Sequence, residues 1–416
     1  MQMNATVEKA LLLALASWLG VGCRHATSAT LAANQKRMPT TSEYKETRSD
    51  IPPQLQPFWA KISQEGEQNR VLNCMEAGLA AMQEGCWRLA EEWLDNALDR
   101  IEAIYADRPD AAKARSLWYA EGKKDFKGEP YERVMAYYYR GLLYLRAGDY
   151  QNAEACFKSG MLQDARAEEV QYRCDFALMA FLEGWSAQCL GQKDEANEAY
   201  REVNSLRQSF VPPDWNHNTL ILVETGVSPR KLADGVYHEK LRLFRGKGVE
   251  EQFVQLAIDG TETPMMPLED IAWQAMTRGG RVVEYILKDK AAFKHANERI
   301  ASVVADVAAA GFVVAPFLQS ASVEIQIASG GLAVVSIIEM SIAAKANPHA
   351  DIRYWRNLPD LVHVHTCRLS TNTPAQIQAH FFDTNRVELI ELRKQVPVYY
   401  DRQGFGLGWV RARPAW

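Results

Sequence analysis

The stretch that decides the fold reads Tyr137-Tyr-Tyr-Arg-Gly-Leu-Leu-Tyr-Leu-Arg-Ala-Gly-Asp-Tyr-Gln-Asn-Ala-Glu-Ala-Cys-Phe157. Gly141 and Gly148 stand seven residues apart, Ala153 follows five residues later, and Phe157 four residues after that. The same spacing recurs twice, in Gly78, Gly85, Ala90 and Leu94, and in Gly184, Gly191, Ala196 and Tyr200. A spacing that recurs three times in one chain indicates an internal repeat.

Each of these units is expected to be a helix, a tight turn and a return helix. A glycine inside a helix costs about 1 kcal/mol relative to alanine, so the first glycine indicates close approach of a second helix. The second glycine is expected to end the first helix in the left-handed conformation. We expect the alanine to lie on the return helix and to face the first glycine, with the large residue filling the next layer.

The middle unit resembles the tetratricopeptide repeat, through Tyr137-x2-Arg140-Gly141-x2-Tyr144 and Ala153-x3-Phe157. This resemblance implies helical-pair repeats over residues 65–210, with a groove suited to a partner protein or peptide. The units start 63 and 43 residues apart, whereas that repeat has a period of roughly 34 residues. An unrelated all-helical bundle therefore remains the alternative.

The N-terminus has the pattern of a targeting segment. Lys9 precedes the apolar run Ala10–Leu19, which is too short to span a membrane and has the length of a signal-peptide core. Small residues then lead to Cys23, and the stretch resembles a bacterial lipobox. The resemblance implies a signal peptide at 1–22, lipidation of Cys23 and a location on the periplasmic face of the outer membrane. A non-lipidated signal or a partly buried helix is the alternative reading, and residues 23–64 are predicted to be a tether.

The second half, residues 214–416, is predicted to be an α+β domain with mainly antiparallel strands. The predicted strands are Thr219–Thr225, Leu241–Arg245, Phe253–Ile258, Val282–Leu287, Leu361–Leu369, Gln376–Phe382, Val387–Leu392 and Gly408–Val410. A small-residue helical segment is expected at 290–347. Its uncharged part, Val307–Val323, is predicted to be buried, with contact to a membrane or to another subunit as the alternative.

No motif of an established catalytic class occurs, so we expect no enzyme activity and no cofactor. His363, His365 and Cys367 share one face of a predicted strand, and with His380 they form the only candidate metal set, against the alternative of a wet strand face. The cysteines after Cys23 contain no Cys-x-x-Cys, and buried thiols are preferred to disulfides. A net charge of −5 over 416 residues gives no basic field for nucleic acid.

Three stretches carry a further resemblance: Tyr131–Gly141, Leu222–Lys231 and Asp351–Pro359. Together with the lipobox, the chain resembles a family of bacterial envelope lipoproteins with tetratricopeptide-like N-terminal halves. The resemblance implies no established activity, and it implies partners near cell-wall synthesis. From the residues alone, Asp351, Arg353 and Trp355 are expected to fix a connection into a strand, and Thr225–Lys231 to form a turn.

The leading hypothesis is a non-enzymatic interaction scaffold that binds an envelope protein in the repeat groove. The second hypothesis is a structural subunit that associates with further copies of itself. A hydrolase acting on peptidoglycan, with unrecognised catalytic residues, is the third.

Overall fold

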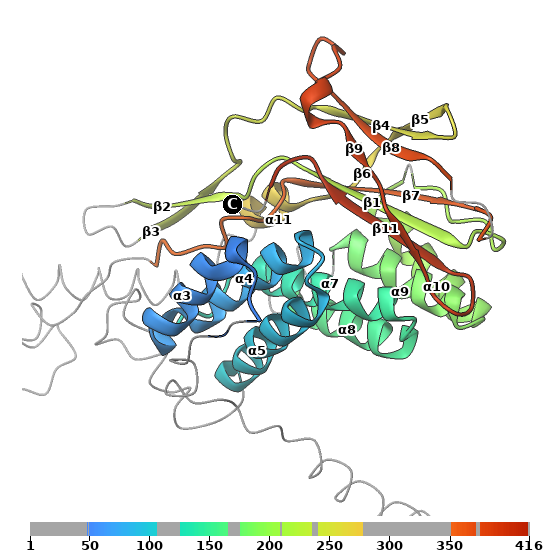
Figure 1. Ribbon diagram of the computed structural model, residues 1–416. Coiled ribbons are helices and arrows are strands. Elements are labelled where there is room, and N and C mark those ends of the chain that lie inside the picture. The colour runs from blue at the N-terminus through green and yellow to red at the C-terminus, as the bar shows by residue number, and fades with distance from the viewer. Residues whose placement is uncertain are drawn as a thin grey trace, which may run out of the picture. The chain divides into compact units, whose positions relative to one another are not determined.

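The computed structural model describes residues 48, 50–105, 125–164, 175–208, 210–234, 240–277, 351–371 and 375–414. All of them belong to one compact unit that starts at Arg48. Figure 1 shows its helices in a lower layer and its strands above them. An α+β mixture with antiparallel-rich sheets is thus confirmed.

The helical layer consists of three packed pairs. The elements are α3 (Gln56–Gln64), α4 (Arg70–Gln83), α5 (Trp87–Tyr105), α7 (Pro130–Ala147), α8 (Tyr150–Asp164), α9 (Ala177–Cys189) and α10 (Lys193–Leu206), with short 3-10 turns η2 (Pro53–Leu55) and η3 (Glu67–Asn69). Helix α4 packs on α5, α7 on α8, and α9 on α10. Each pair coincides with one of the three glycine units.

The corners of the three pairs have the same backbone geometry. Gly85, Gly148 and Gly191 adopt left-handed φ values of 69°, 75° and 77°. In each corner the next amide donates to the carbonyl five residues back, as in Asp149 N to Tyr144 O at 3.0 Å. This hydrogen bond satisfies a carbonyl that the end of the helix would leave without a partner. The spacing in the sequence therefore corresponds to a recurring turn.

The atoms nearest to the first glycine of each unit belong to the large residue of the return helix, rather than to the alanine that we expected there. A Cβ on Gly78 would lie 2.7 Å from Leu94 Cγ, one on Gly184 would lie 2.7 Å from Tyr200 Cε1, and one on Gly141 would overlap the Phe157 ring. Helical side chains lean toward the N-terminus of their own helix, so a residue one turn further along covers the glycine.

The strands form two larger sheets and one hairpin. Their bounds are β1 (Thr219–Thr225), β2 (Arg230–Asp234), β3 (Lys240–Phe244), β4 (Phe253–Ile258), β5 (Thr261–Met265), β6 (Pro267–Asp270), β7 (Leu361–Cys367), β8 (Ile377–Phe382), β9 (Lys394–Gln395), β10 (Val398–Tyr400) and β11 (Gly406–Arg411). The orders are β10-β11-β1-β7-β6 and β5-β4-β8-β9, and β2 pairs with β3. Strand β1 pairs with β11 in parallel, and the other pairings are antiparallel.

The five-stranded sheet is covered on both faces. Ile221 and Val223 of β1 pack against Val254, Leu256 and Phe381 of the four-stranded sheet, and this contact forms an apolar core. On its other face, Glu224 of β1 accepts hydrogen bonds from Tyr138 and Tyr139 of α7, and Trp409 of β11 packs edge-on against Tyr139. The five-stranded sheet, which we call the first sheet, therefore lies between the helices and the four-stranded sheet, which we call the second sheet, as Figure 1 shows.

Two predicted boundaries are wrong. The predicted tether, residues 23–64, contains α3, where Trp59 and Ile62 are buried. The predicted strand Val387–Leu392 forms only an isolated bridge, from Glu388 to Phe382, followed by a 3-10 turn, η7 (Ile390–Leu392). Asp383 Oδ1 accepts hydrogen bonds from the amides of Asn385 and Val387, and this local bonding turns the chain away from a strand.

The remaining differences concern short elements. Strands β2, β5, β6, β9 and β10 and helix α11 (Ile271–Thr277) were not expected from the sequence. The predicted strand Val282–Leu287 and the predicted helical segment 290–347 lie outside the described residues.

Candidate functional site

The stretches Tyr131–Gly141, Leu222–Lys231 and Asp351–Pro359 meet at one buried interface between the helices and the first sheet. Glu132 of α7 accepts hydrogen bonds from Lys231 Nζ at 3.1 Å and from the Trp355 amide at 2.8 Å. Glu132 is 0% exposed and Lys231 is 5% exposed. The charged pair therefore joins three distant segments of the chain inside the protein.

A second buried carboxylate, Glu224 of β1, lies at the same interface. It accepts hydrogen bonds from the hydroxyls of Tyr138 and Tyr139 at 3.1 and 2.9 Å and from Trp409 Nε1 at 2.9 Å. Arg411 Nε lies 3.0 Å from Glu224 Oε2. Burial raises the pKa of Glu224, and Arg411 acts in the opposite direction. A carboxylate with so many donors fixes α7 on β1 and β11.

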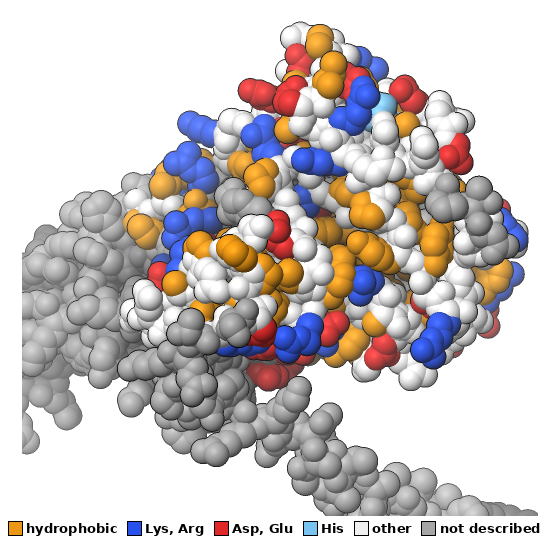
Figure 2. Space-filling model, viewed as in Figure 1, with side chains coloured by type: hydrophobic (Ala, Val, Ile, Leu, Met, Phe, Trp, Pro, Cys, Tyr) orange, Lys and Arg blue, Asp and Glu red, His pale blue; other side chains and the backbone are white. Residues whose placement is uncertain are grey.

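These contacts cover the face of the helical layer that was predicted to bind a partner. Nearly every side chain of the first helices, α4, α7 and α9, is buried. Along α7 the cover includes Glu224 and Trp409 of the chain's own sheet. Trp87 of α5 packs edge-on against Tyr399 of β10. Figure 2 shows hydrophobic side chains along the boundary between the helices and the sheets. A partner in that groove would have to displace the sheet.

Arg353 and Trp355 have the structural role that their sequence suggested. Arg353 donates to Asn69 Oδ1 at 2.7 Å and pairs with Asp351 at 2.7 Å. Trp355 is fully buried. The turn predicted at Thr225–Lys231 is correct at Gly226, which has a φ of 77°, but Lys231 belongs to β2.

The candidate metal set does not come together. Both ring nitrogens of His363 are engaged by the protein, Nε2 with Thr225 Oγ1 at 3.2 Å and Nδ1 with Met265 O at 3.3 Å. His363 is 2% exposed, so the strand face is closed to water at this residue, whereas His365 and Cys367 on the same face are partly exposed. His380 lies on β8 in the other sheet, beside Glu388. Among the described residues no group of three or more His, Cys, Asp or Glu could hold a metal ion.

The cysteines within the described ranges are free thiols. Cys74, Cys156 and Cys189 are buried, and Cys86 and Cys367 are partly buried. Burial raises the pKa of Cys74 and of Cys156 to about 12 and that of Cys367 to about 11. Such thiols are protonated and unreactive at neutral pH. Cys174 and the lipidation candidate Cys23 lie outside the described residues.

None of the helices within the described ranges combines the length and the apolar character needed to cross a membrane. The uncharged stretch Val307–Val323 lies outside those ranges.

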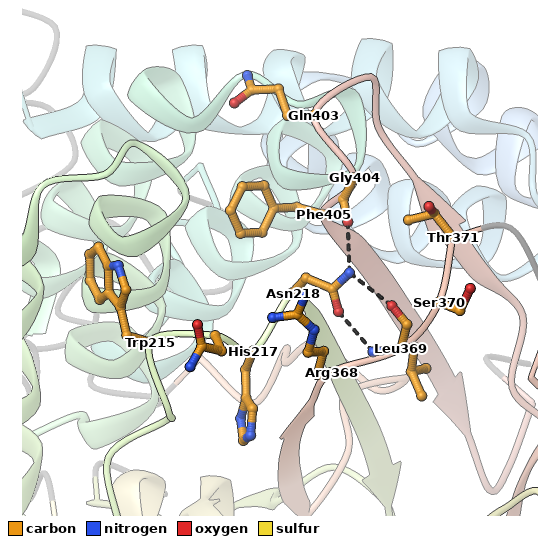
Figure 3. Close-up of a pocket in the computed structure, with 11 residues that line it drawn as sticks. Trp215, His217, Asn218, Arg368, Leu369, Ser370, Thr371, Gln403, Gly404 and Phe405 are labelled. Carbon is orange, nitrogen blue, oxygen red and sulfur yellow. Dashed lines mark hydrogen bonds between the residues drawn. The ribbon is translucent and has the colours of Figure 1, made fainter.

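A pocket of about 700 Å³ lies at one end of the first sheet, where three connections meet (Figure 3). Asn218 holds them together: its Nδ2 donates to Leu369 O at 3.1 Å and to Gly404 O at 3.0 Å. Its Oδ1 accepts from the Leu369 amide at 2.9 Å. Asn218 thus joins the α10–β1, β7–β8 and β10–β11 connections, and the pocket is fixed in shape.

The walls of this pocket, which we call the sheet-end pocket, carry both aromatic and polar groups. They consist of Trp215, Asn216, His217, Asn218, Arg368, Leu369, Ser370, Thr371, Gln403, Gly404 and Phe405. Gln188 Nε2 of α9 donates a hydrogen bond to Asp214 O at 3.1 Å and so fixes the backbone beside Trp215. The Tyr150 ring of α8 packs edge-on against the Phe405 ring, with 5.8 Å between the ring centroids. The helical layer therefore fixes both aromatic walls.

A second opening, which we call the edge groove, lies beside the first and measures about 360 Å³. It runs between the Phe210–Pro213 linker and strands β6 and β7, and Phe181 of α9 also lines it. Val211 and Met266 line it and are 81% and 77% exposed. Exposed apolar side chains beside an apolar groove are typical of an interaction surface.

Sequence reasoning missed both openings. Residues of the sheet-end pocket come from positions 215–218, 368–371 and 403–405, which only the folded sheet brings together. The available signal was the aromatic and amide-rich run Trp215-Asn-His-Asn218 directly after Pro212-Pro213. In a connection between two layers such side chains are unusual unless they have partners or a ligand.

Comparison of the chain with models of protein families, with curated proteins and with solved structures finds no match.

Proposed function

We propose that this chain is a non-enzymatic lipoprotein of the cell envelope, anchored through Cys23 in the outer membrane, and that it acts as an interaction scaffold. We propose further that its three helical pairs are repeats of the tetratricopeptide type. In this proposal the partner binds at the edge groove rather than on the covered face of the helices.

The observation that carries the proposal is the partly unpaired edge of β7. Strand β1 pairs with the whole of β7, whereas β6 pairs only with Leu361–His363. Among the described strands none pairs with Val364–Cys367 on that side. Val364, His365 and Thr366 instead line the edge groove. A free strand edge beside an apolar groove is suited to the addition of one extended segment.

The chemistry of the groove indicates the kind of segment. Arg207 is already paired with Glu269 at 2.9 Å, and burial together with His217 lowers the pKa of His365, so both groups add little net charge. We therefore propose an extended, uncharged segment of another envelope protein, with apolar side chains at alternate positions. Its backbone would bond to β7, and its side chains would contact Val211 and Met266.

Site-specific photo-crosslinking in intact envelopes tests this proposal. A photoreactive amino acid at Met266 is expected to give one discrete adduct with a different protein, and Val211→Asp should abolish it. The matched control is the same amino acid at Val387, which is 60% exposed and lies in the turn after β8 of the four-stranded sheet. Mass spectrometry should place the crosslink in an extended apolar segment of the partner.

The outcomes separate the hypotheses. An adduct with a second copy of the chain would favour the self-assembling structural subunit. Equal adducts from Met266 and Val387, or none from Met266, would contradict a specific groove. The anchor is tested separately, because Cys23→Ser should release the chain from the outer-membrane fraction, and unchanged fractionation would contradict lipidation at this residue.

A further inference from the structure

Within the described residues, the sheet-end pocket carries a cation, Arg368, that no carboxylate neutralises. Arg368 is exposed at the end of β7 and, within the described part of the chain, has no ion pair or hydrogen bond through its guanidinium. Figure 3 shows Arg368 between Trp215 on one side and Ser370 on the other. A guanidinium in a pocket can bind a carboxylate through two parallel hydrogen bonds.

The other groups around Arg368 suit a polar ring. Trp215, which is 39% exposed, and Phe405 provide apolar faces, while Thr371 and Gln403 provide a hydroxyl and an amide. Lys193 lies over the Trp215 ring at 5.8 Å, on α10. Aromatic faces pack against the C–H face of a sugar ring, and amides and hydroxyls bond to sugar hydroxyls.

We propose that the sheet-end pocket binds an acidic saccharide, with one carboxylate on Arg368 and a sugar ring against Trp215 or Phe405. Three features favour this ligand over a small inorganic anion. The volume of about 700 Å³ is in the range of sites for small organic ligands. The pocket has two aromatic walls, and Arg368 is the one lysine or arginine among its described lining residues, where a multiply charged phosphate would need several.

The pocket is preorganised by hydrogen bonds within the protein, which lowers the cost of binding a ligand. The Asn218 amide is fully occupied in holding Leu369 and Gly404, and His217 Nδ1 lies 3.0 Å from Thr366 Oγ1. The side chains offered to the ligand therefore project from a frame that its entry does not have to order. The edge groove uses other side chains, apart from His217, so this inference does not depend on the proposed function.

Calorimetric titration of the full chain in detergent tests the inference with two probes, a trisaccharide of galacturonic acid and a tetrasaccharide of hyaluronan. At least one of the two probes is expected to bind and to change the tryptophan fluorescence of the chain. The affinity for that probe should fall about tenfold or more in the Arg368→Gln variant. Trp215→Ala should weaken the same probe. The matched controls are Arg201→Gln, an exposed cation on α10, and Phe253→Ala, an exposed aromatic residue on β4.

Two further probes decide the chemistry. The methyl ester of the galacturonic trisaccharide, which carries no charge, should bind at least about tenfold more weakly than the acid. Inorganic phosphate should not compete at equal concentration. Three outcomes would each overturn the inference. The first is equal binding of the ester and the acid, and the second is competition by phosphate at equal concentration. The third is that the folded chain without substitutions binds neither acidic saccharide.

Discussion

The helical layer and the sheet layer use their faces in opposite ways. The first helices of the three pairs, the face that helical repeats present as a groove, are buried, in α7 partly by the chain's own β1 and β11. The first sheet, covered on both faces, remains open at its end and along part of β7. The difference teaches that when the chain's own sheet covers one face of the helical pairs, the open surfaces lie at strand edges and connections.

The largest expected effect concerns the contact that joins the layers. Glu224→Gln removes the charge opposite Arg411, which is 6% exposed, and leaves a buried cation without its partner. Breaking a buried pair in this way should cost about 3–5 kcal/mol in the free energy of unfolding. Urea denaturation measures it. The control Glu388→Gln, which removes a surface pair with Arg393, should cost less than about 1 kcal/mol.

A loss for Glu224→Gln no larger than that of its control would show that the layers are held together by other contacts.

The next effect concerns the free energy of unfolding at acid pH. Burial lowers the pKa of His363 to about 4, from 6.5 in the unfolded chain. Between these values the unfolded state binds one more proton than the folded state, so the free energy of unfolding should fall by about 3 kcal/mol as pH drops from 6.5 to 4. His363→Gln should lack this contribution. Denaturation at several pH values compares the two chains.

Glu269 serves as a control, because its contribution to the free energy of unfolding should change with pH in the opposite direction. Burial raises its pKa to about 7, so the folded state keeps a proton that the unfolded state has lost. Its contribution to stability should therefore decrease as pH rises from 4.5 to 7, and Glu269→Gln should remove that decrease. If His363→Gln and Glu269→Gln change the slope of stability against pH in the same direction, the assignment of His363 is wrong.

A smaller effect tests the close approach of the paired helices α7 and α8. In Gly141→Ala the new methyl group would overlap the ring of Phe157, which is packed between the helices, at an expected cost of about 1–3 kcal/mol. Gly160→Ala is the matched control, because its methyl group meets only the flexible end of Met179 and a Tyr137 Cβ at 3.3 Å. Thermal melts should show a clear loss in the first variant and little change in the second. Equal losses would contradict the role of the first glycine.

The smallest effect is expected in the open region. Val211→Asp and Met266→Glu change side chains that are 81% and 77% exposed, so each should alter the free energy of unfolding by less than about 0.5 kcal/mol. Binding of the partner should nevertheless be lost. A large loss of stability would mean that these side chains serve the fold, and the contrast between the layers would weaken.

The parts of the fold that the sequence predicts are those fixed by nearby residues. The corner at Gly148 depends on hydrogen bonds that reach five residues back, and β1 and β4 have the bounds that their apolar patterns predict. The candidate sites depend on distant residues: Glu224 meets Tyr138 and Arg411, and no local pattern specifies such a meeting. The metal candidate failed for the same reason, because Met265 and Thr225 occupy the ring of His363.

The parallel pairing of β1 with β11 also sets the order in which the protein can be completed. Asn218 and Gly404, which are bonded at the start of these strands, are 186 positions apart, so the sheet closes only after the chain has been synthesised through β11. The helices are made first, and the side chains of α7 that β11 later covers remain in water until then. Pairings this distant slow folding. A chain that stops before residue 406 would therefore present the helical face that the finished protein hides.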